Sequence, residues 1–293
     1  MVSVIIPVYN RRDLALQAVS SVLGQSMHDL EVILVDDGST DGLDALLSPY
    51  LADPRLRLLR LQHSGFPGAV RNRGAEQARG EWIAFLDSDD LWFSRKLQLQ
   101  LDYARLNPKV RCIHTGEIWL RGDQVVSQNS QNHQREGNLF ADSLKKCIIG
   151  PSTVLISRDC FHGLGGFRED IEVAEDYEFW LRLTSHMVVG YVDEPLALKR
   201  AGYGGDQLSF RYGQIEIFRI RGLHDLLLSG WLDDQPEMRS LACGELSRKC
   251  LVYAKGARKR GHEQQARYYA SLAEAYSESS SCTTSARSGL PRA

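Results

Sequence analysis

The sequence predicts an α/β protein with a doubly wound, mostly parallel sheet flanked by helices and followed by a helical extension. Over the first ~90 residues, short apolar runs rich in β-branched residues alternate with stretches of helical periodicity. This alternation is typical of βαβ units with parallel, buried strands. From residue 214 to 276 the periodicity is almost entirely helical, which predicts the extension.

Composition narrows the class of protein. The chain has 293 residues, of which 43% are hydrophobic and 25% charged, as expected of a globular protein. Its net charge of −2 gives no general attraction for nucleic acid. No apolar run approaches the ~20 residues that span a bilayer, and no basic segment precedes the first apolar run, so we expect no secretory signal. Six dispersed cysteines then indicate reduced thiols and a cytoplasmic protein.

The elements follow from periodicity and turn residues. In the first part, the expected strands are residues 2–8, 30–35, 56–61 and 82–86, with helices at 11–25, after Asp41, and from Gly68 to Ala78. Further along, we expect helices at 95–106 and 175–185, strands at 110–120, 124–127, 152–157 and 188–199, and a mobile loop at 129–136. The extension should contain two or three helices, with breaks near 230–236 and 256–261. The serine- and threonine-rich residues 277–293 should be disordered.

A carboxylate cluster follows the fourth strand. Asp87 and Asp89 are two residues apart, so on an extended chain both side chains point the same way. Like charges this close favour protonation of one group unless a cation lies between them. A hard divalent cation that also grips phosphates fits this arrangement. The alternative is that Asp90 caps a helix starting at Leu91, which would leave Asp87 and Asp89 unexplained.

Polar residues also follow the first two strands, as Tyr9-Asn10 and Asp36-Asp37. Ligands of open parallel sheets bind outside the carboxyl ends of the strands, so these residues should gather with the cluster in one site. Other sites are not indicated. No G-x-G-x-x-G follows the first strand, residues 256–261 lack the lysine of a P-loop, and the histidines form no zinc-binding pair.

Four segments occur in a fixed order: residues 3–10 (SVIIPVYN), 35–41 (VDDGSTD), 71–74 (RNRG) and 87–90 (DSDD). Together they resemble the family 2 glycosyltransferases of the GT-A fold over roughly residues 1–210, and residues 175–182 (EDYEFWLR) resemble the family's later acidic motif. The resemblance implies inverting transfer of a sugar from a nucleotide diphosphate donor, which we expect to be a UDP-sugar. The implied cofactor is Mg²⁺ or Mn²⁺, and the implied acceptor is a sugar or lipid-linked glycan in polysaccharide or glycoconjugate biosynthesis.

On this basis residues 1–213 form a GT-A domain, with a nucleotide-sugar half at about 1–110 and an acceptor half at about 111–213. Residues 214–276 form the extension and 277–293 a tail. The sequence leaves open whether the protein associates peripherally with the inner face of a membrane and whether it forms a homo-oligomer.

The resemblance assigns donor contacts residue by residue. The expected donor-binding residues are Pro7, Tyr9, Asn10, Asp36, Asp37, Gly68, Arg71, Asn72, Asp87 and Ser88. Asp37 would contact the base, since a carboxylate accepts hydrogen bonds from base N–H groups and an aromatic ring such as Tyr9 can stack on the base. Arg71 would reach a phosphate, and Asp87 and Asp89 would hold the metal. The alternatives are a helix cap and turn for Asp36-Asp37 and a solvated surface side chain for Arg71.

In the resemblance, the later acidic motif supplies the catalytic base, and Asp176 is the expected residue. It lies at the open N-terminal end of its helix, where the helix dipole stabilises a carboxylate that could deprotonate the acceptor hydroxyl. Glu175 points about 100° away around the helix and is either the alternative base or structural. Without the resemblance, both would be read as an N-terminal charge pair. Glu178 and Arg182 are expected to form an exposed i,i+4 pair without function.

One segment departs from the family pattern. Residues 202–209 read GYGGDQLS, and Gly204 stands where family members often carry a histidine near the metal or diphosphate. Either Tyr203 or Asp206 substitutes, or water completes the metal shell, which puts metal affinity and activity in question. Two alternatives to the enzyme therefore stay open: a non-catalytic nucleotide-sugar-binding or scaffold protein, and a sugar nucleotidyltransferase. The latter would want a glycine-rich loop after the first strand, where residues 10–13 contain no glycine.

Overall fold

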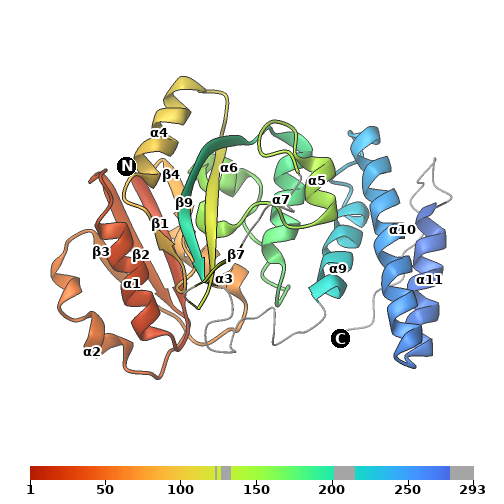
Figure 1. Cartoon of the computed structure of the whole chain (residues 1–293), viewed down its shortest axis with the longest axis horizontal. Coiled ribbons are helices and arrows are strands. Elements are labelled where there is room, and N and C mark those ends of the chain that lie inside the picture. The colour runs from red at the N-terminus through yellow and green to blue at the C-terminus, as the bar shows by residue number, and fades with distance from the viewer. Residues whose placement is uncertain (123, 127–132, 201–214, 278–293) are drawn as a thin grey trace.

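The computed structural model describes residues 1–122, 124–126, 133–200 and 215–277. Within these ranges, nine strands form one mixed sheet in the order β3-β2-β1-β4-β8-β6-β9-β5, with β7 paired to β6 (Figure 1). The strands are β1 (Val2–Val8), β2 (Leu30–Asp36), β3 (Leu56–Arg60), β4 (Trp82–Phe85), β5 (Leu91–Trp92), β6 (Cys112–Arg121), β7 (Gln124–Val126), β8 (Leu155–Ser157) and β9 (Gly190–Arg200). The helices are α1 (Arg12–Leu23), α2 (Leu43–Leu47), α3 (Pro67–Glu76), α4 (Lys96–Leu106), α5 (Phe140–Lys145), α6 (Arg158–Gly163), α7 (Glu175–His186), α9 (Ile215–Leu228), α10 (Pro236–Lys259) and α11 (Glu263–Ser277), with 3-10 turns at Tyr50–Ala52 and Pro151–Thr153.

The first four strands are parallel, and β1, β2 and β4 are buried on both faces, whereas the edge strand β3 is only partly buried. Alternate residues of β1 point to opposite sides, so Ile5 packs with Val70 of α3 while Val4 packs with Val19 of α1. In register, Val8 of β1 pairs with Asp36 of β2. The residues that follow these two strands, Tyr9 and Asp37, are therefore brought together at one edge of the sheet.

The second half of the sheet is irregular. β8 is antiparallel to both β4 and β6, whereas the long strands β6 and β9 run parallel. Their register shifts around Gly116, where a side chain would overlap the Glu194 backbone. Such a bulge bends a strand pair and re-aims the side chains beyond it.

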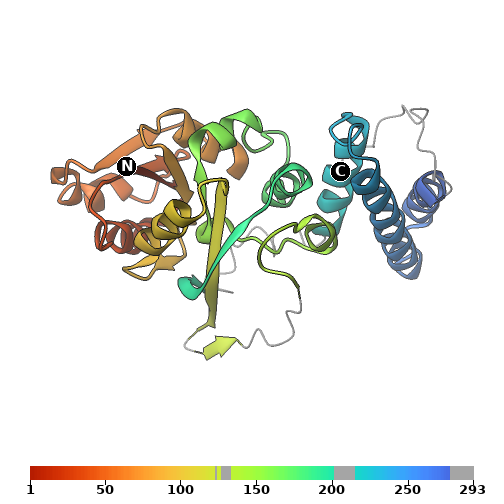
Figure 2. The same ribbon diagram turned by 90° about the horizontal axis from the view of Figure 1, so that it is seen from above.

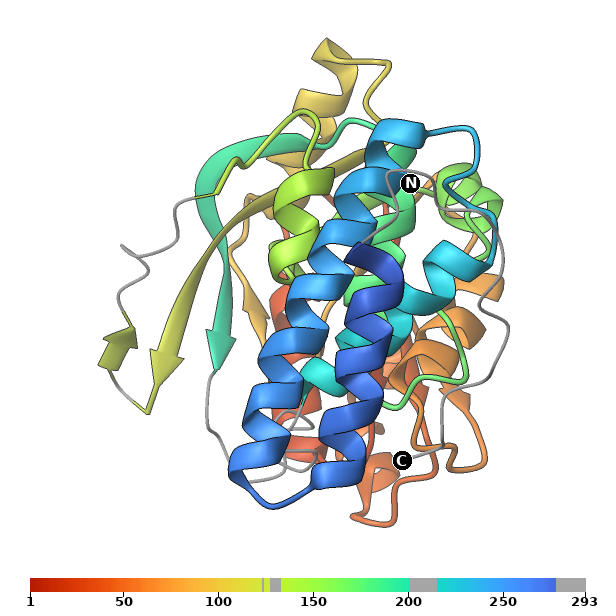
Figure 3. The ribbon, with the colours of Figure 1, turned by 90° about the vertical axis from the view of Figure 1, so that its right-hand side faces the viewer.

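The C-terminal helices form a layer of their own. α10 and α11 pack as an antiparallel hairpin, and α9 lies between the hairpin and α7 (Figures 2 and 3). Their apolar residues continue a core that begins at α5 and α7, including Tyr177, Leu223, Leu246 and Tyr269. No helix in the described part of the chain is long and apolar enough to cross a membrane.

Most expected elements are confirmed, and the differences are local. The expected strand at 152–157 is a 3-10 turn followed by the short strand β8, because Pro151 opens a helical turn. The alternative in which Asp90 caps a helix starting at Leu91 is excluded, since Leu91 and Trp92 form strand β5. Residues 202–209 and the expected tail at 277–293, apart from Ser277 at the end of α11, lie outside the described residues, as does half of the expected loop at 129–136, residues 129–132.

Candidate active site

The ends of β1, β2 and β3 meet around Asp37. Its Oδ1 accepts a hydrogen bond from the Ser64 N–H at 2.9 Å, and its Oδ2 accepts one from the Gly65 N–H at 3.1 Å. His63 Nδ1 lies 2.9 Å from Asp37 Oδ2, and the His63 ring stacks on Tyr9 with centroids 3.9 Å apart. Asp37 thus joins two loops, and a carboxylate has lone pairs for a further donor. Sequence reasoning missed His63, although it follows the third strand as Tyr9 follows the first.

Asp36 and Asn10 shape the turn beside this pocket. Asp36 Oδ1 accepts a hydrogen bond from the Ser39 N–H at 2.9 Å, and Asn10 Oδ1 accepts one from the Thr40 N–H at 2.8 Å. Asn10 adopts a positive φ of 50°, which asparagine tolerates better than most residues. The side chain of Asp36 is thereby committed to the turn rather than to a helix cap.

Arg71 joins the end of β4 to the start of α7. Its Nη2 donates to Asp87 Oδ1 at 2.6 Å, and its Nη1 donates to Glu175 Oε1. The side chain is only 7% exposed, so a solvated surface role is excluded. Arg11, from the loop after β1, donates in the same manner to Asp89 Oδ2 at 2.8 Å. Asp87 and Asp89 therefore each have an arginine side chain as partner, and Arg11 is a site residue that the sequence did not single out.

The carboxyl groups of the site have unequal proton affinities. Burial raises the pKa of Asp87, but the charges of Arg71 and Lys199 outweigh it and lower that pKa. Burial and the neighbouring charge of Asp87 raise the pKa of Asp89. Burial also raises the pKa of Glu175, to about 7. Such divergence within one cleft is typical of functional sites.

Asp87 and Asp89 fit a hard divalent cation. Their oxygens are the ligands that Mg²⁺ and Mn²⁺ prefer, and the raised pKa of Asp89 reflects a like-charge contact that a cation would relieve. Among the described residues, no group of three or more His, Cys, Asp or Glu side chains has the geometry to hold a metal. A cation here would therefore take its other ligands from a diphosphate and water, as Mg²⁺ commonly does.

Asp90 connects the acidic turn, residues 87–90, to neighbouring elements of the fold. It is 2% exposed, accepts a hydrogen bond from the Ser152 hydroxyl at 2.6 Å, and accepts another from the Arg200 N–H at 3.2 Å. Ser152 Oγ also accepts from the Asp87 N–H at 3.1 Å. Burial raises the pKa of Asp90 to about 8, against the lowering charge of Lys199. In place of a helix cap, Asp90 links the turn to Ser152 and to the end of β9.

The start of α7 presents two different carboxylates. Glu175 is 5% exposed and ion-paired with Arg71. Asp176 is half-buried; its Oδ1 accepts from the Tyr177 N–H at 2.7 Å, and Cys147 Sγ lies 3.4 Å from its Oδ2. Ala174 before them has a φ of 67°, a left-handed conformation that costs an alanine about 1–2 kcal/mol. Asp176 is thus the more open of the two, at a helix start under backbone strain.

A wall of β6 and β9 faces these carboxylates. Trp119 pairs in register with Lys199, and Glu117 lies two residues earlier on the same face of β6. Trp119 Nε1 donates to Glu117 Oε1 at 2.6 Å, and Lys199 Nζ lies 5.4 Å from the Trp119 ring centroid. Burial lowers the pKa of Lys199, but the charges of Asp90, Glu117, Asp87 and Asp176 raise it overall. These residues escaped sequence reasoning, since strand alternation marks a face but not what it faces.

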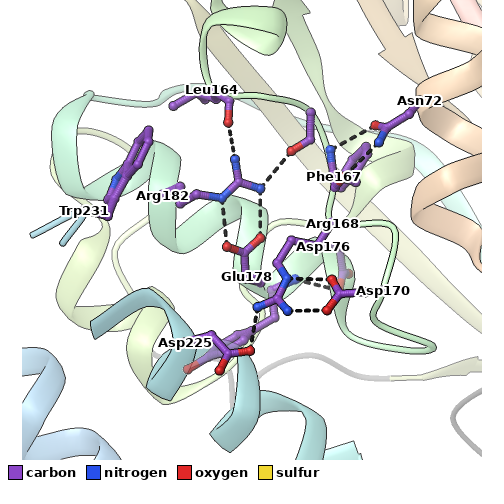
Figure 4. A network of polar contacts seen from close by, with 12 residues as sticks. Asn72, Leu164, Phe167, Arg168, Asp170, Asp176, Glu178, Arg182, Asp225 and Trp231 are labelled. Carbon is purple, nitrogen blue, oxygen red and sulfur yellow. Dashed lines mark hydrogen bonds and ion pairs between the residues drawn. The ribbon is translucent and has the colours of Figure 1, made fainter. Parts of the chain in front are cut away.

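The segment between α6 and α7 is held by side chains from two helices (Figure 4). Arg182 binds both oxygens of Glu178 at 2.8 Å and donates to the carbonyls of Leu164 and Gly166. The expectation of an exposed pair is therefore wrong: Glu178 and Arg182 are 3% and 8% exposed, because this segment folds over them.

Two residues of α3, expected at the donor, also contact this segment. The Asn72 amide bonds Phe167 twice, donating to its carbonyl at 2.7 Å and accepting from its N–H at 2.9 Å. At Gly68, a Cβ would overlap the Arg168 carbonyl oxygen. Both residues let α3 approach the segment closely and so set the position of α7.

Comparison with known proteins adds to this geometry. A model of the glycosyl transferase family 2 matches residues 3–164. The putative teichuronic acid biosynthesis glycosyltransferase TuaG of Bacillus subtilis is 35% identical over 192 residues, which cover 65% of this chain and 75% of TuaG. An uncharacterized glycosyltransferase of Rickettsia felis is 37% identical over 205 residues, or 69% of this chain. This chain spans about a third of the length of that protein (33%).

Two solved structures share the fold. Staphylococcus aureus TarS (residues 1–349), in complex with UDP-GlcNAc, has a TM-score of 0.62 and 19% identity, with 94% of this chain and 91% of that chain covered. The mannosyltransferase PcManGT of Pyrobaculum calidifontis, in complex with GDP-Man and Mn²⁺, has a TM-score of 0.60 and 16% identity, with 96% and 87% covered.

The architecture is thus that of the GT-A glycosyltransferases, a mixed α/β sheet with its site at the carboxyl ends of the strands. Within this class, the chain belongs to glycosyl transferase family 2. The resemblance stated from the sequence motifs is confirmed.

Proposed function

We propose that this chain transfers a sugar from a nucleotide diphosphate donor, with a UDP-sugar as the first candidate, to a hydroxyl group of a sugar or lipid-linked glycan. The observation that carries the proposal is the meeting of Asp87, Arg71 and the Glu175-Asp176 pair across 104 residues of sequence. One buried arginine thereby joins the acidic turn, which we assign to the diphosphate, to the helix start that carries the candidate base Asp176.

Each part of the donor has a group suited to it. Tyr9 and Asp37 offer a stacking surface and a hydrogen-bond acceptor for the nucleobase. Arg71 and Arg11 offer charge-assisted donors for the diphosphate next to the two aspartates that they contact. A divalent cation held by Asp87 and Asp89 would neutralise charge on the leaving diphosphate.

Asp176 is the group we assign as general base. As the acceptor oxygen attacks the anomeric carbon, a new C–O bond forms, the bond to the diphosphate breaks with its electron pair leaving on the diphosphate, and the hydroxyl proton passes to the Asp176 carboxylate. Attack from the face opposite the leaving group inverts the anomeric configuration. Glu175 holds Arg71 rather than the acceptor, since its carboxylate is buried against that guanidinium.

Names of relatives suggest substrate classes to test. The Escherichia coli relative WfgD, 30% identical over 183 residues covering 62% of this chain and 69% of WfgD, is described as a UDP-Glc:α-D-GlcNAc-diphosphoundecaprenol β-1,3-glucosyltransferase. With the TarS complex, this favours UDP as the donor nucleotide and a lipid-linked glycan as one acceptor class.

Calorimetric titration of UDP, GDP and TDP, with and without Mn²⁺, tests the proposal. We expect metal-dependent binding of one nucleotide, which Asp89→Asn should abolish. Unchanged binding by that variant would contradict the metal role of Asp89. If the folded protein binds none of the three nucleotides, the non-catalytic alternative stands.

A further inference from the structure

The second half of α10 carries an exposed face that neither of its neighbouring helices covers. This face, called here the basic stripe, consists of Leu251, Val252, Lys255, Arg258 and Lys259. Leu251 and Val252 are 54% and 58% exposed, among the most open large apolar side chains of the described residues. Leu241, earlier on the same helix, is also exposed, at 49%.

The helical period explains why the basic stripe is exposed to solvent. Leu246, Cys250, Tyr253 and Ala257 lie on the opposite side of α10, where they are buried in the core shared with α9 and α11. Both apolar faces of α10 cannot be covered by the same two helices. The stripe therefore faces away from the protein.

The charges of the stripe are local and mostly uncompensated. Within the described residues, no ion pair is found for Lys255 or Lys259, and Arg258 only approaches Glu263 at 4.0 Å. The three cations of the stripe stand in a chain with a net charge of −2, so their clustering is not a consequence of overall composition.

The position of the stripe relates it to the candidate site. The tip of the α10–α11 hairpin lies toward the same side of the molecule as the carboxyl ends of β6 and β9, at the lower edge of Figures 1 and 3. β1, β2 and β4 run in the same sense as β6, because β8 is antiparallel to both β4 and β6. A surface that contacts the hairpin tip would therefore lie on the side on which the strand ends open.

We propose that the basic stripe docks the protein peripherally on an anionic lipid surface. Cations attract anionic headgroups, and the adjacent leucine and valine can enter the boundary between headgroups and acyl chains. A nucleic acid would match the cations alone and leave the apolar pair without a partner; an acidic protein is distinguished from a lipid surface by the test below. Docking here would hold the candidate site beside a membrane, which suits a lipid-linked acceptor. The docking itself does not depend on the proposed function; its link to a lipid-linked acceptor does.

Sedimentation of the full chain with vesicles tests the proposal. The probes are vesicles of phosphatidylcholine alone and of phosphatidylcholine with 30% phosphatidylglycerol. We expect binding to the anionic vesicles only, weakened by 0.5 M salt. Removal of a cation should weaken partitioning about fivefold, so K255Q/R258Q/K259Q should weaken it about 100-fold. The double variant L251Q/V252Q should weaken it about tenfold.

A matched control makes the same charge change elsewhere. Arg95, Arg105 and Lys109 are exposed on and beside α4, at the opposite edge of the molecule (Figure 1). The variant R95Q/R105Q/K109Q should bind vesicles as the wild type does. Equal loss in both triple variants would show dependence on net charge and overturn the stripe as the docking surface.

Two further outcomes overturn the proposal. One is wild-type chain that is folded, binds nucleotide and yet fails to sediment with anionic vesicles at low salt. The other is an L251Q/V252Q variant that binds vesicles undiminished while the wild type binds immobilised polyglutamate equally well, which indicates an acidic protein as the partner. Nucleotide titration is independent of all these readouts, so failure of docking and failure of the proposed function are distinguishable.

Discussion

The two halves of the sheet build their parts of the candidate site in different ways. In the parallel half, Tyr9, Asp37 and Asp87 each follow directly after a strand, and the order of the chain alone brings them together. In the other half, Asp176 depends on Cys147 and on a segment that Arg182 holds in place. Local sequence therefore places the residues proposed to bind the donor, whereas the candidate base is placed by tertiary packing.

The largest expected effect is on the rate of sugar transfer, and it separates the role of the candidate base from that of the donor pocket. Asp176→Asn should lower the rate of sugar transfer by about 10²–10⁴-fold, since the asparagine amide cannot accept the acceptor's proton. Nucleotide affinity should stay within threefold of wild type, because Asp37 and Arg71 are untouched. Transfer assays and calorimetry on the same preparation measure both quantities.

Glu175→Gln is the companion variant. It removes a partner of Arg71 and so should disturb nucleotide affinity more than Asp176→Asn does. If Glu175→Gln instead abolished transfer with normal nucleotide binding while Asp176→Asn remained active, the roles assigned to the two carboxylates would be reversed.

The second effect tests the packing that positions α7. Arg182→Gln should lower the free energy of unfolding by about 3–5 kcal/mol, since it leaves the buried carboxylate of Glu178 without a countercharge. Arg105→Gln on α4 is the matched control, because Arg105 also pairs with an acid one turn away but is 69% exposed. That control should change stability by less than about 0.5 kcal/mol. Urea unfolding compares the two, and equal effects would mean that burial does not set the strength of the Glu178–Arg182 pair.

The third effect is a loss of stability when the contact between the two halves at Gly68 is disturbed. Gly68→Ala should destabilise the protein by about 1–3 kcal/mol, because the new methyl group meets the Arg168 carbonyl oxygen on the segment before α7. In Gly244→Ala on α10, the methyl group has no atom within 4 Å, and the change should stabilise by up to about 1 kcal/mol through helix propensity. Thermal unfolding distinguishes opposite signs readily. A neutral Gly68→Ala would show that the segment can move away from α3 without loss.

These comparisons indicate what sequence can and cannot predict in this chain. The parallel strands and the donor-side residues were predictable because a strand, its turn and its polar end lie within ten residues. The pairing of Glu178 with Arg182 was predictable from i,i+4 spacing, but its burial was not, because that depends on residues 164–166 folding over it. The role of Asp90 was not predictable for the same reason: the local pattern offered only a capping alternative, whereas its partner, Ser152, lies 62 residues away.

Asp90 gives the subtlest test, since it joins the two halves through Ser152 and the end of β9. Its pKa of about 8 in the folded chain exceeds the ordinary aspartate value of about 4, so the folded state binds more protons between these pH values. The stability of the wild type should therefore fall as pH rises through this window, by at most about 1.4 kcal/mol per pH unit from this group. Asp90→Asn keeps an acceptor for Ser152 and should flatten that slope, whereas Asp13→Asn on the exposed face of α1 should not.

Urea unfolding at pH 5, 6, 7 and 8 measures the slopes. Part of the slope should survive in Asp90→Asn, since Glu175 has a folded pKa of about 7 and also takes up a proton within the window. The double variant with Glu175→Gln should remove that part between about pH 4.5 and 7. An Asp90→Asn variant whose slope equals that of the wild type would mean that Asp90 is ionised throughout and that Lys199 compensates its burial. The acidic turn would then be joined to β9 by an ion pair rather than by a neutral hydrogen-bonded carboxyl group.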